Sequence, residues 1–464
     1  MTAAETIASF ATSITLDDVP DEVVEHAKLH VLDALGCGLA AHATGNGVEG
    51  RATMQELGGD GQATVIGLTD RLPAANAAFA NAMICHGLDF DDTHSDSGSH
   101  VAAVIAPAAF AAGELYGTDG RDVLAAIVAG NEVVCRIGMA APGAFHERGF
   151  HPTAICGVFG ATAAVSRLAG FDAETATRAL GIAGSMASGI FAYLADGTPT
   201  KPIHPGWAAH GAHIATRLAH HGAAGPRSVF DARFGIYHAY VGIEPGSSGL
   251  VEQLADLGSR WETPRIAYKP FPICHFTHGA VGAVVDAVEG RTFAPEEIAE
   301  IVASVPEPWV PIVLEPAGEK KTPRSAYEGK FSLQYAVASM LVRGHVGVTD
   351  FTASAIADPD VLAVAAKVSH ERRDFATYPE AFPGAVRIEL ASGETLEREL
   401  AYQKGAPENP WSTDDVRAKF RANAELALAS APAAALEGAI LALDQLHDLT
   451  AALAPLTLRE VATV

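Results

Sequence analysis

Apolar residues recur at helical spacing through the first half of the chain, in Ala-rich segments that Gly, Pro and Asn interrupt. One such segment, 21–43, follows Pro20 and has acidic residues in its first turn, which favours a helix N-terminus at that point. The same spacing predicts further helices at 74–85, 121–139, 153–168, 173–186 and 207–221. Because alanine and glycine let helices approach closely, we predict a buried multi-helix core in this half.

The pattern changes near Arg265. Residues 299–305 are typical of a strand, and residues 385–400 alternate apolar and polar positions around a Ser-Gly pair, which predicts a β-hairpin. Three apolar residues of the hairpin should face one side of the sheet: Val386, Ile388 and Leu390. Helical stretches at 331–342 and 360–368 complete the pattern of an α+β domain with an antiparallel sheet.

After Pro410 the helical pattern returns, but a block of about 50 residues is small for independent folding. We expect it to join the first helical domain. The predicted fold is therefore mainly α, with a large all-helical domain made from both chain ends, 1–266 and 403–464. A smaller α+β lid domain with an antiparallel sheet, 267–402, is inserted between them.

Charge and cysteine content narrow the function classes. With 55 acidic against 31 basic residues, the formal charge of −24 repels phosphate backbones and anionic lipid, so we expect no nucleic-acid and no membrane partner. The N-terminus lacks the basic stretch and apolar region of a signal peptide, and we expect a cytoplasmic protein. The five cysteines are widely spaced without a CxxC pair, which is typical of buried free thiols.

Common cofactor and nucleophile motifs are missing: we find no dinucleotide fingerprint, P-loop, GxSxG elbow or HExxH. Polar side chains gather instead in loops between apolar helices. The densest cluster, 86–100, holds four acids and three histidines, including Asp89 and His100, together with Thr93. It is suited to proton transfer or to a metal ion, and equally to capping the helix that follows.

Three other segments carry candidate chemistry. His151 directly precedes a proline-initiated helix, whose dipole disfavours a protonated imidazole, so a neutral base is one interpretation and a simple loop end the other. Lys201 lies between two prolines, either as a rigidly held cation or as a solvated turn residue. At the predicted domain junction stand Lys269, Cys274 and His278, where small-molecule clefts tend to form.

Five motifs, in this order along the chain, carry a family resemblance: LDFDDT with His100 downstream, GFHPTAICGVFGATAA, TKPIHPGWAAHG, KPFPICHFTH and GKFSLQYAVA. They resemble the MmgE/PrpD family, which includes 2-methylcitrate dehydratases, cis-aconitate decarboxylases and iminodisuccinate epimerases. The resemblance implies a helical domain with an α+β lid, a homodimer, and a reaction that needs neither metal nor organic cofactor. It also implies an active site with these residues: Asp89, Thr93, His100, His151, Lys201, Lys269, Cys274 and His278.

From this resemblance we expect a lyase of the dehydratase or decarboxylase type, acting on a small di- or tricarboxylate. A proton next to a carboxylate would be removed, with Lys201 and Lys269 stabilising the negative charge. His151 and His100 would serve as base and acid, and Asp89 and Thr93 would orient an imidazole or accept a substrate hydroxyl. The alternatives are an iminodisuccinate-type epimerase, an inactive carboxylate-binding protein, and a metal-dependent hydrolase that uses the 86–100 cluster.

Overall fold

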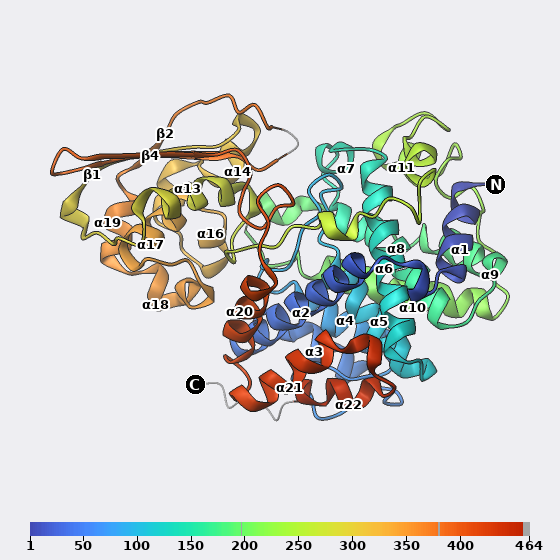
Figure 1. The fold of residues 1–464 in the computed structure, drawn as a ribbon. Coiled ribbons are helices and arrows are strands. Elements are labelled where there is room, and N and C mark those ends of the chain that lie inside the picture. The colour runs from blue at the N-terminus through green and yellow to red at the C-terminus, as the bar shows by residue number, and fades with distance from the viewer. Residues whose placement is uncertain (196, 379–380, 458–464) are drawn as a thin grey trace. The chain divides into compact units, whose positions relative to one another are not determined.

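The computed structural model describes residues 1–195, 197–378 and 381–457, and within these ranges the chain is mainly helical (Figure 1). It forms two compact units. The first comprises Met1–Ala195, Thr200–Ala267 and the chain from Ser412 onward, and the second comprises Tyr268–Trp411 with the short stretch before Thr200.

Helices make up the first unit. Its longer helices are α1 (Ala3–Ser13), α2 (Asp21–Ala43), α3 (Val48–Leu57), α4 (Ala74–Cys85), α5 (Ala102–Tyr116), α6 (Gly120–Met139), α8 (Pro152–Leu168), α9 (Ala173–Ala183), α10 (Ile203–His220), α20 (Thr413–Ala424) and α21 (Ser430–Leu441). The short ones are α7 (Ala144–Glu147), α11 (Ile236–Val241), α12 (Leu250–Leu254) and α22 (Leu449–Leu453).

The predicted helices at 21–43 and 74–85 are confirmed to the residue, as α2 and α4. Helix α9 ends at Ala183, three residues before the predicted end, and α10 begins at Ile203, four residues before the predicted start. Helix α5 was predicted only as the helix that follows the 86–100 cluster, without bounds. It contains Pro107 and is buried on nearly every face, so its sequence shows no amphipathic period.

Close helix crossings form the core of the first unit, as the small residues predict. Helices α6 and α8 meet at Gly130 and Gly160, where a Cβ added to Gly160 would lie 2.6 Å from the Gly130 carbonyl oxygen. Helix α20 packs against α2 at Gly36, where an added Cβ would lie 3.2 Å from the Phe420 Cα. Figure 1 shows the C-terminal helix α20, in red, beside the blue α2.

The second unit contains a four-stranded sheet of order β2-β1-β3-β4. Its strands are β1 (Ile298–Ser304), β2 (Val368–His370), β3 (Gly384–Leu390) and β4 (Thr395–Leu400). The predicted hairpin is confirmed: β3 and β4 pair antiparallel, Gly393 takes a φ of +89° in the turn, and Val386, Ile388 and Leu390 are buried together. Helix α13 (His278–Val288) packs against β3 and β4, and α17 (Leu333–Arg343) packs against α13.

The prediction of a purely antiparallel sheet is wrong, because β2 pairs parallel to β1. Helix α19 (Pro359–Ala365) ends before Val368, a residue that we had expected to be helical. The chain thus returns from the helix directly into a strand, and a strand that follows a helical crossover can pair parallel to the strand before it. The sheet is mixed.

Two further expectations concern thiols and membranes. All five cysteines are buried, as predicted, and none of them forms a disulfide. Within the described ranges, none of the helices combines the length and the apolar character that crossing a bilayer requires.

Histidines serve as packing elements on α10. His210 and His213 donate ring N–H groups to the carbonyls of Ala75 in α4 and Ala108 in α5, each at 3.1 Å. Burial lowers the pKa of His213 to about 4. The ring is therefore neutral in the folded protein and takes up a proton on unfolding at any pH between this value and about 6.5.

This difference predicts a pH-dependent stability contribution. His213 stabilises the fold fully above about pH 6.5, and the contribution is lost as the pH falls toward 4. Between pH 7 and pH 5, the free energy of unfolding should fall by about 2 kcal/mol more in the parent than in His213→Gln, which cannot titrate. Urea unfolding followed by tryptophan fluorescence measures both slopes. Equal slopes would contradict the prediction.

Candidate active site

The loop between α4 and α5, residues 86–101, brings most of the predicted site residues of the first unit together. It is almost entirely buried, and Asp89 adopts a φ of +53°, a left-handed conformation that is uncommon for a residue other than glycine. Thr93 forms an isolated antiparallel bridge with Ala267, through N–H···O bonds of 2.9 and 2.8 Å. The neighbouring structure therefore imposes the shape of the loop.

Asp91 lies between two histidines of this loop. Its carboxylate is 2.8 and 2.9 Å from His86 Nδ1, and 3.4 Å from His100 Nδ1. Burial alone would raise the pKa of the Asp91 carboxyl, but the imidazoles of His86 and His100 outweigh it and hold this pKa far below its usual range. Asp91 is thus an anion that can stabilise positive charge on either ring.

The tautomer of His100 follows from its neighbours. Its Nδ1 lies 2.7 Å from the Asp92 carbonyl oxygen, which can only accept, so Nδ1 carries a hydrogen. Thr93 Oγ1 is 3.3 Å from the same nitrogen. The proton that can be exchanged is therefore the one on Nε2.

Lys201 faces that nitrogen. Its Nζ is 3.4 Å from His100 Nε2 and donates to Asp89 Oδ2 at 2.8 Å, while Asp89 Oδ1 is 3.7 Å from the same imidazole nitrogen. Lys201 is 8% exposed and stands in the turn before α10. The interpretation of Lys201 as a solvated turn residue is wrong, because an ion pair and an imidazole enclose its ammonium group.

His151 contributes a further imidazole. It is the N-cap residue of α8, as its position before Pro152 predicts, and its Nδ1 is 3.0 Å from His204 Nδ1 on α10. The ring centroid of His151 lies 6.0 Å from that of His86 and 6.0 Å from that of His100. Burial and the nearby Lys201 hold the pKa of His151 well below its usual range, and burial lowers the pKa of His204 to about 4.

The predicted site residues leave out three members of this cluster: His86 and Asp91, which the sequence analysis placed only in the 86–100 cluster, and His204. His204 follows Lys201 by three residues, one helical turn, and this spacing could have drawn attention to it. The acids of the loop are alike in sequence, and only geometry separates them. Asp89 binds Lys201, Asp91 binds two histidines, and Asp92 accepts from the backbone N–H groups of Val101 and Ala102 at the start of α5.

The remaining candidates, Lys269, Cys274 and His278, belong to the second unit, where all three are buried. His278 stands at the start of α13, and its Nε2 donates to the Ile273 carbonyl at 3.2 Å. For these three residues a role in substrate binding stays a prediction.

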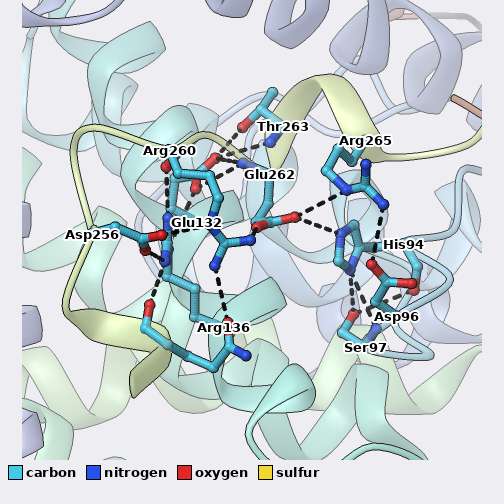
Figure 2. A network of polar contacts seen from close by, with 11 residues as sticks. His94, Asp96, Ser97, Glu132, Arg136, Asp256, Arg260, Glu262, Thr263 and Arg265 are labelled. Carbon is cyan, nitrogen blue, oxygen red and sulfur yellow. Dashed lines mark hydrogen bonds and ion pairs between the residues drawn. The ribbon is translucent and has the colours of Figure 1, made fainter. Parts of the chain in front are cut away.

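A network of ion pairs and hydrogen bonds connects the loop to residues 262 and 263 (Figure 2). The Glu132 carboxylate accepts from the backbone N–H groups of Glu262 and Thr263 at 2.9 Å, and burial raises the pKa of Glu132. Glu262 in turn lies 3.3 Å from His94 Nε2. Since residues 262 and 263 lead directly to the Ala267 that pairs with Thr93, the network fixes this edge of the site.

Comparison with known proteins identifies the family. The model of the MmgE/PrpD N-terminal domain matches residues 5–247, and that of the MmgE/PrpD C-terminal domain matches residues 271–445. The chain belongs to the MmgE/PrpD family. The two family models thus match two domains in succession along the chain. They do not support the predicted arrangement, in which a lid is inserted into a single domain made from both chain ends. Helices α20 and α21 belong to the second domain by sequence and to the first unit by packing.

Relatives in this family cover almost the whole chain. A cis-aconitate decarboxylase of Mus musculus is 30% identical over 96% of this chain and 91% of its own length. The cis-aconitate decarboxylase of Homo sapiens is 30% identical over 95% and 92%, and one of Aspergillus terreus is 28% identical over 96% and 94%. At the level of the family, these relatives support a lyase that acts on a carboxylate.

The lowered pKa values of His151 and His204 predict that both rings stay neutral from pH 6.5, the usual imidazole pKa, to pH 8. Their ring nitrogens, observed by long-range ¹H–¹⁵N NMR on protein labelled in histidine, should not titrate over this range. Spectra of His151→Gln and His204→Gln assign the two signals. A titration of the His151 signal with a midpoint near 6.5 would contradict the prediction.

Proposed function

We propose that this protein is a cofactor-independent lyase that removes CO2 from a small unsaturated tricarboxylate of the cis-aconitate type. One observation carries the proposal: Lys201, Asp89 and His100 form one hydrogen-bonded cluster, with the neutral imidazole of His151 beside it. The relatives that match nearly the whole chain and are named cis-aconitate decarboxylases support decarboxylation over dehydration.

Lys201 is the positive charge in this proposal. In an acidic chain of net charge −24, a buried ammonium group is a local attractor for a polyanionic substrate. When CO2 leaves, the electron pair of the broken C–C bond stays on the substrate, and a fixed cation stabilises that charge better than water does. Asp89 accepts a hydrogen bond from the ammonium group and holds it beside His100.

The two histidines then take different roles. His100 is the acid: Asp91 stabilises its positive charge, and a proton on Nε2 can pass to the substrate carbon that received the electron pair. His151 is kept neutral, so it accepts a proton or a hydrogen bond from the substrate. Thr93 steadies the His100 ring from its Nδ1 side.

By the family resemblance, Lys269, Cys274 and His278 contact the remaining carboxylates of the substrate, and the active protein is a homodimer. A loss of such a contact raises KM more than it lowers kcat. Lys269→Ala is the variant that tests the lysine among these three proposed contacts.

Lys201→Ala should lower kcat for cis-aconitate by at least about 10²-fold, because the charge that develops on loss of CO2 is no longer neutralised. Product formation is followed by ¹H NMR in D2O, where one solvent deuterium should enter the product and the signal should be lost in His100→Gln. Lys321→Ala, which removes a half-buried lysine of the second unit, should keep parental turnover.

The same NMR assay separates the alternatives when 2-methylcitrate and iminodisuccinate are included. Loss of water without loss of CO2 favours the dehydratase, and deuterium in recovered substrate without any product favours the epimerase. Binding shifts without turnover or exchange favour an inactive carboxylate-binding protein. Turnover of Lys201→Ala within a few fold of the parent would remove Lys201 from the chemistry.

A metal-dependent hydrolase remains a second candidate, because one observation favours it. Ring nitrogens of His86, His100 and His151 lie within 4.8 Å of one another, close enough for one ion. The Lys201 ammonium group, 3.4 Å from His100 Nε2, opposes this arrangement because it would lie beside the bound cation.

Metal analysis of protein purified without chelator tests this candidate. The lyase proposal predicts less than about 0.1 equivalent of transition metal and undiminished turnover of cis-aconitate after dialysis against EDTA. A stoichiometric metal whose removal abolishes activity would favour the hydrolase instead.

A further inference from the structure

Behind the active-site loop, a lysine from the far end of the chain is buried in the first unit. Lys419 lies on α20, and its side chain is 5% exposed. Its Nζ is 2.8 Å from Asp33 Oδ1 on α2 and donates to the Phe90 carbonyl oxygen at 2.7 Å. The ammonium group also stands 3.9 Å from the centroid of the Phe90 ring, within the range of a cation–π contact.

Phe90 is the residue between Asp89 and Asp91. These two carboxylates point to different partners, Lys201 for Asp89 and the His86–His100 pair for Asp91. The divergence requires the backbone to turn sharply at this point, and Asp89 does so with its φ of +53°. Such a conformation persists only where surrounding contacts hold it. Lys419 supplies two of those contacts, one to the Phe90 carbonyl and one to its ring.

A gain in the stability of the fold does not explain why Lys419 is buried at this place. Burying an ammonium group and a carboxylate together costs desolvation that their attraction often only balances, so apolar residues could fill the same space. Burial raises the pKa of the Asp33 carboxyl to about 6 even though Lys419 lies beside it. Asp92 and His30 also face Asp33, and they belong to the same buried region behind the loop.

We propose that Lys419 and Asp33 form a positioning pair for the active site: Lys419 holds the peptide between Asp89 and Asp91, and Asp33 keeps Lys419 charged in the interior. The proposal rests on the proposed lyase function of this site. Lys419 touches neither the reacting atoms nor the histidines in it, and it acts through the backbone of Phe90.

A double variant separates positioning from charge compensation. Lys419→Met alone leaves the Asp33 carboxylate buried without its cation and can fail to fold for that reason. Lys419→Met with Asp33→Asn removes both charges at nearly constant volume, so the melting temperature should stay within a few degrees of the parent. In this double variant kcat should fall by about 10- to 100-fold while KM changes less than about threefold, because a misplaced Asp89–Lys201 pair impairs the chemical step more than binding.

A second readout does not depend on turnover. The ring nitrogen signals of His86 and His100, set by their contacts with Asp91, should shift in the double variant. If the parent turns over none of the tested carboxylates, the lyase proposal fails, while these signals still report on the positioning of the loop. Parental kcat together with unshifted imidazole signals in a folded double variant would overturn the positioning role.

Arg421→Met is the matched control. Arg421 is on the same helix and forms an ion pair with Glu437, with Nε 2.6 Å from Oε2. The substitution Arg421→Met removes a cation of α20 that has no contact with Phe90 or Asp33. The control should keep the parental kcat and imidazole signals. An equal loss of kcat in this variant would show that α20 as a whole, and not Lys419, sets the effect, and would also overturn the proposal.

Discussion

Asp89, Asp91 and Asp92 are three buried carboxylates within four residues. Each needs a positively charged or hydrogen-bonding partner, and the three sets of partners lie in different directions. Asp89 turns to a lysine, Asp91 to two imidazoles, and Asp92 to the N-terminal N–H groups of α5 and to His30. An uncompensated carboxylate at this depth would be protonated or would unfold the loop. The first unit is arranged so that a helix end, a turn and the start of another helix supply these partners at the same place.

Small residues make that arrangement possible. The crossing of α6 and α8 at Gly130 and Gly160 brings the two backbones so close that the N-terminus of α8, with His151 as its cap, lies against the loop. Larger side chains at the crossing would push α8 outward. The imidazole cluster would then gain water, and a neutral His151 would lose the burial that keeps it neutral.

Much of the helical architecture could be predicted from sequence, because long Ala-rich segments with turn residues at their ends leave little choice of boundary, as at α2 and α4. The parallel β2 could not, since Val368 continues a helical apolar pattern and only tertiary pairing with β1 makes it a strand. In the site, Lys201 and His151 stand out through flanking prolines. Asp89, Asp91 and Asp92 contact different partners because of backbone angles that residue types do not encode. The contact of His204 with His151 depends on the packing of α10 beside α8, which the sequence does not show.

The contact of Lys419 with Phe90 spans 329 positions of sequence. On the ribosome, the loop with its histidines and acids emerges before Lys419, because helix α20 follows the loop in the sequence. A nascent chain that lacks this helix has the chemical groups of the loop but not the contact from Lys419. The positioning proposed for Lys419 therefore requires that α20 has been made, and a chain cut short before α20 lacks it.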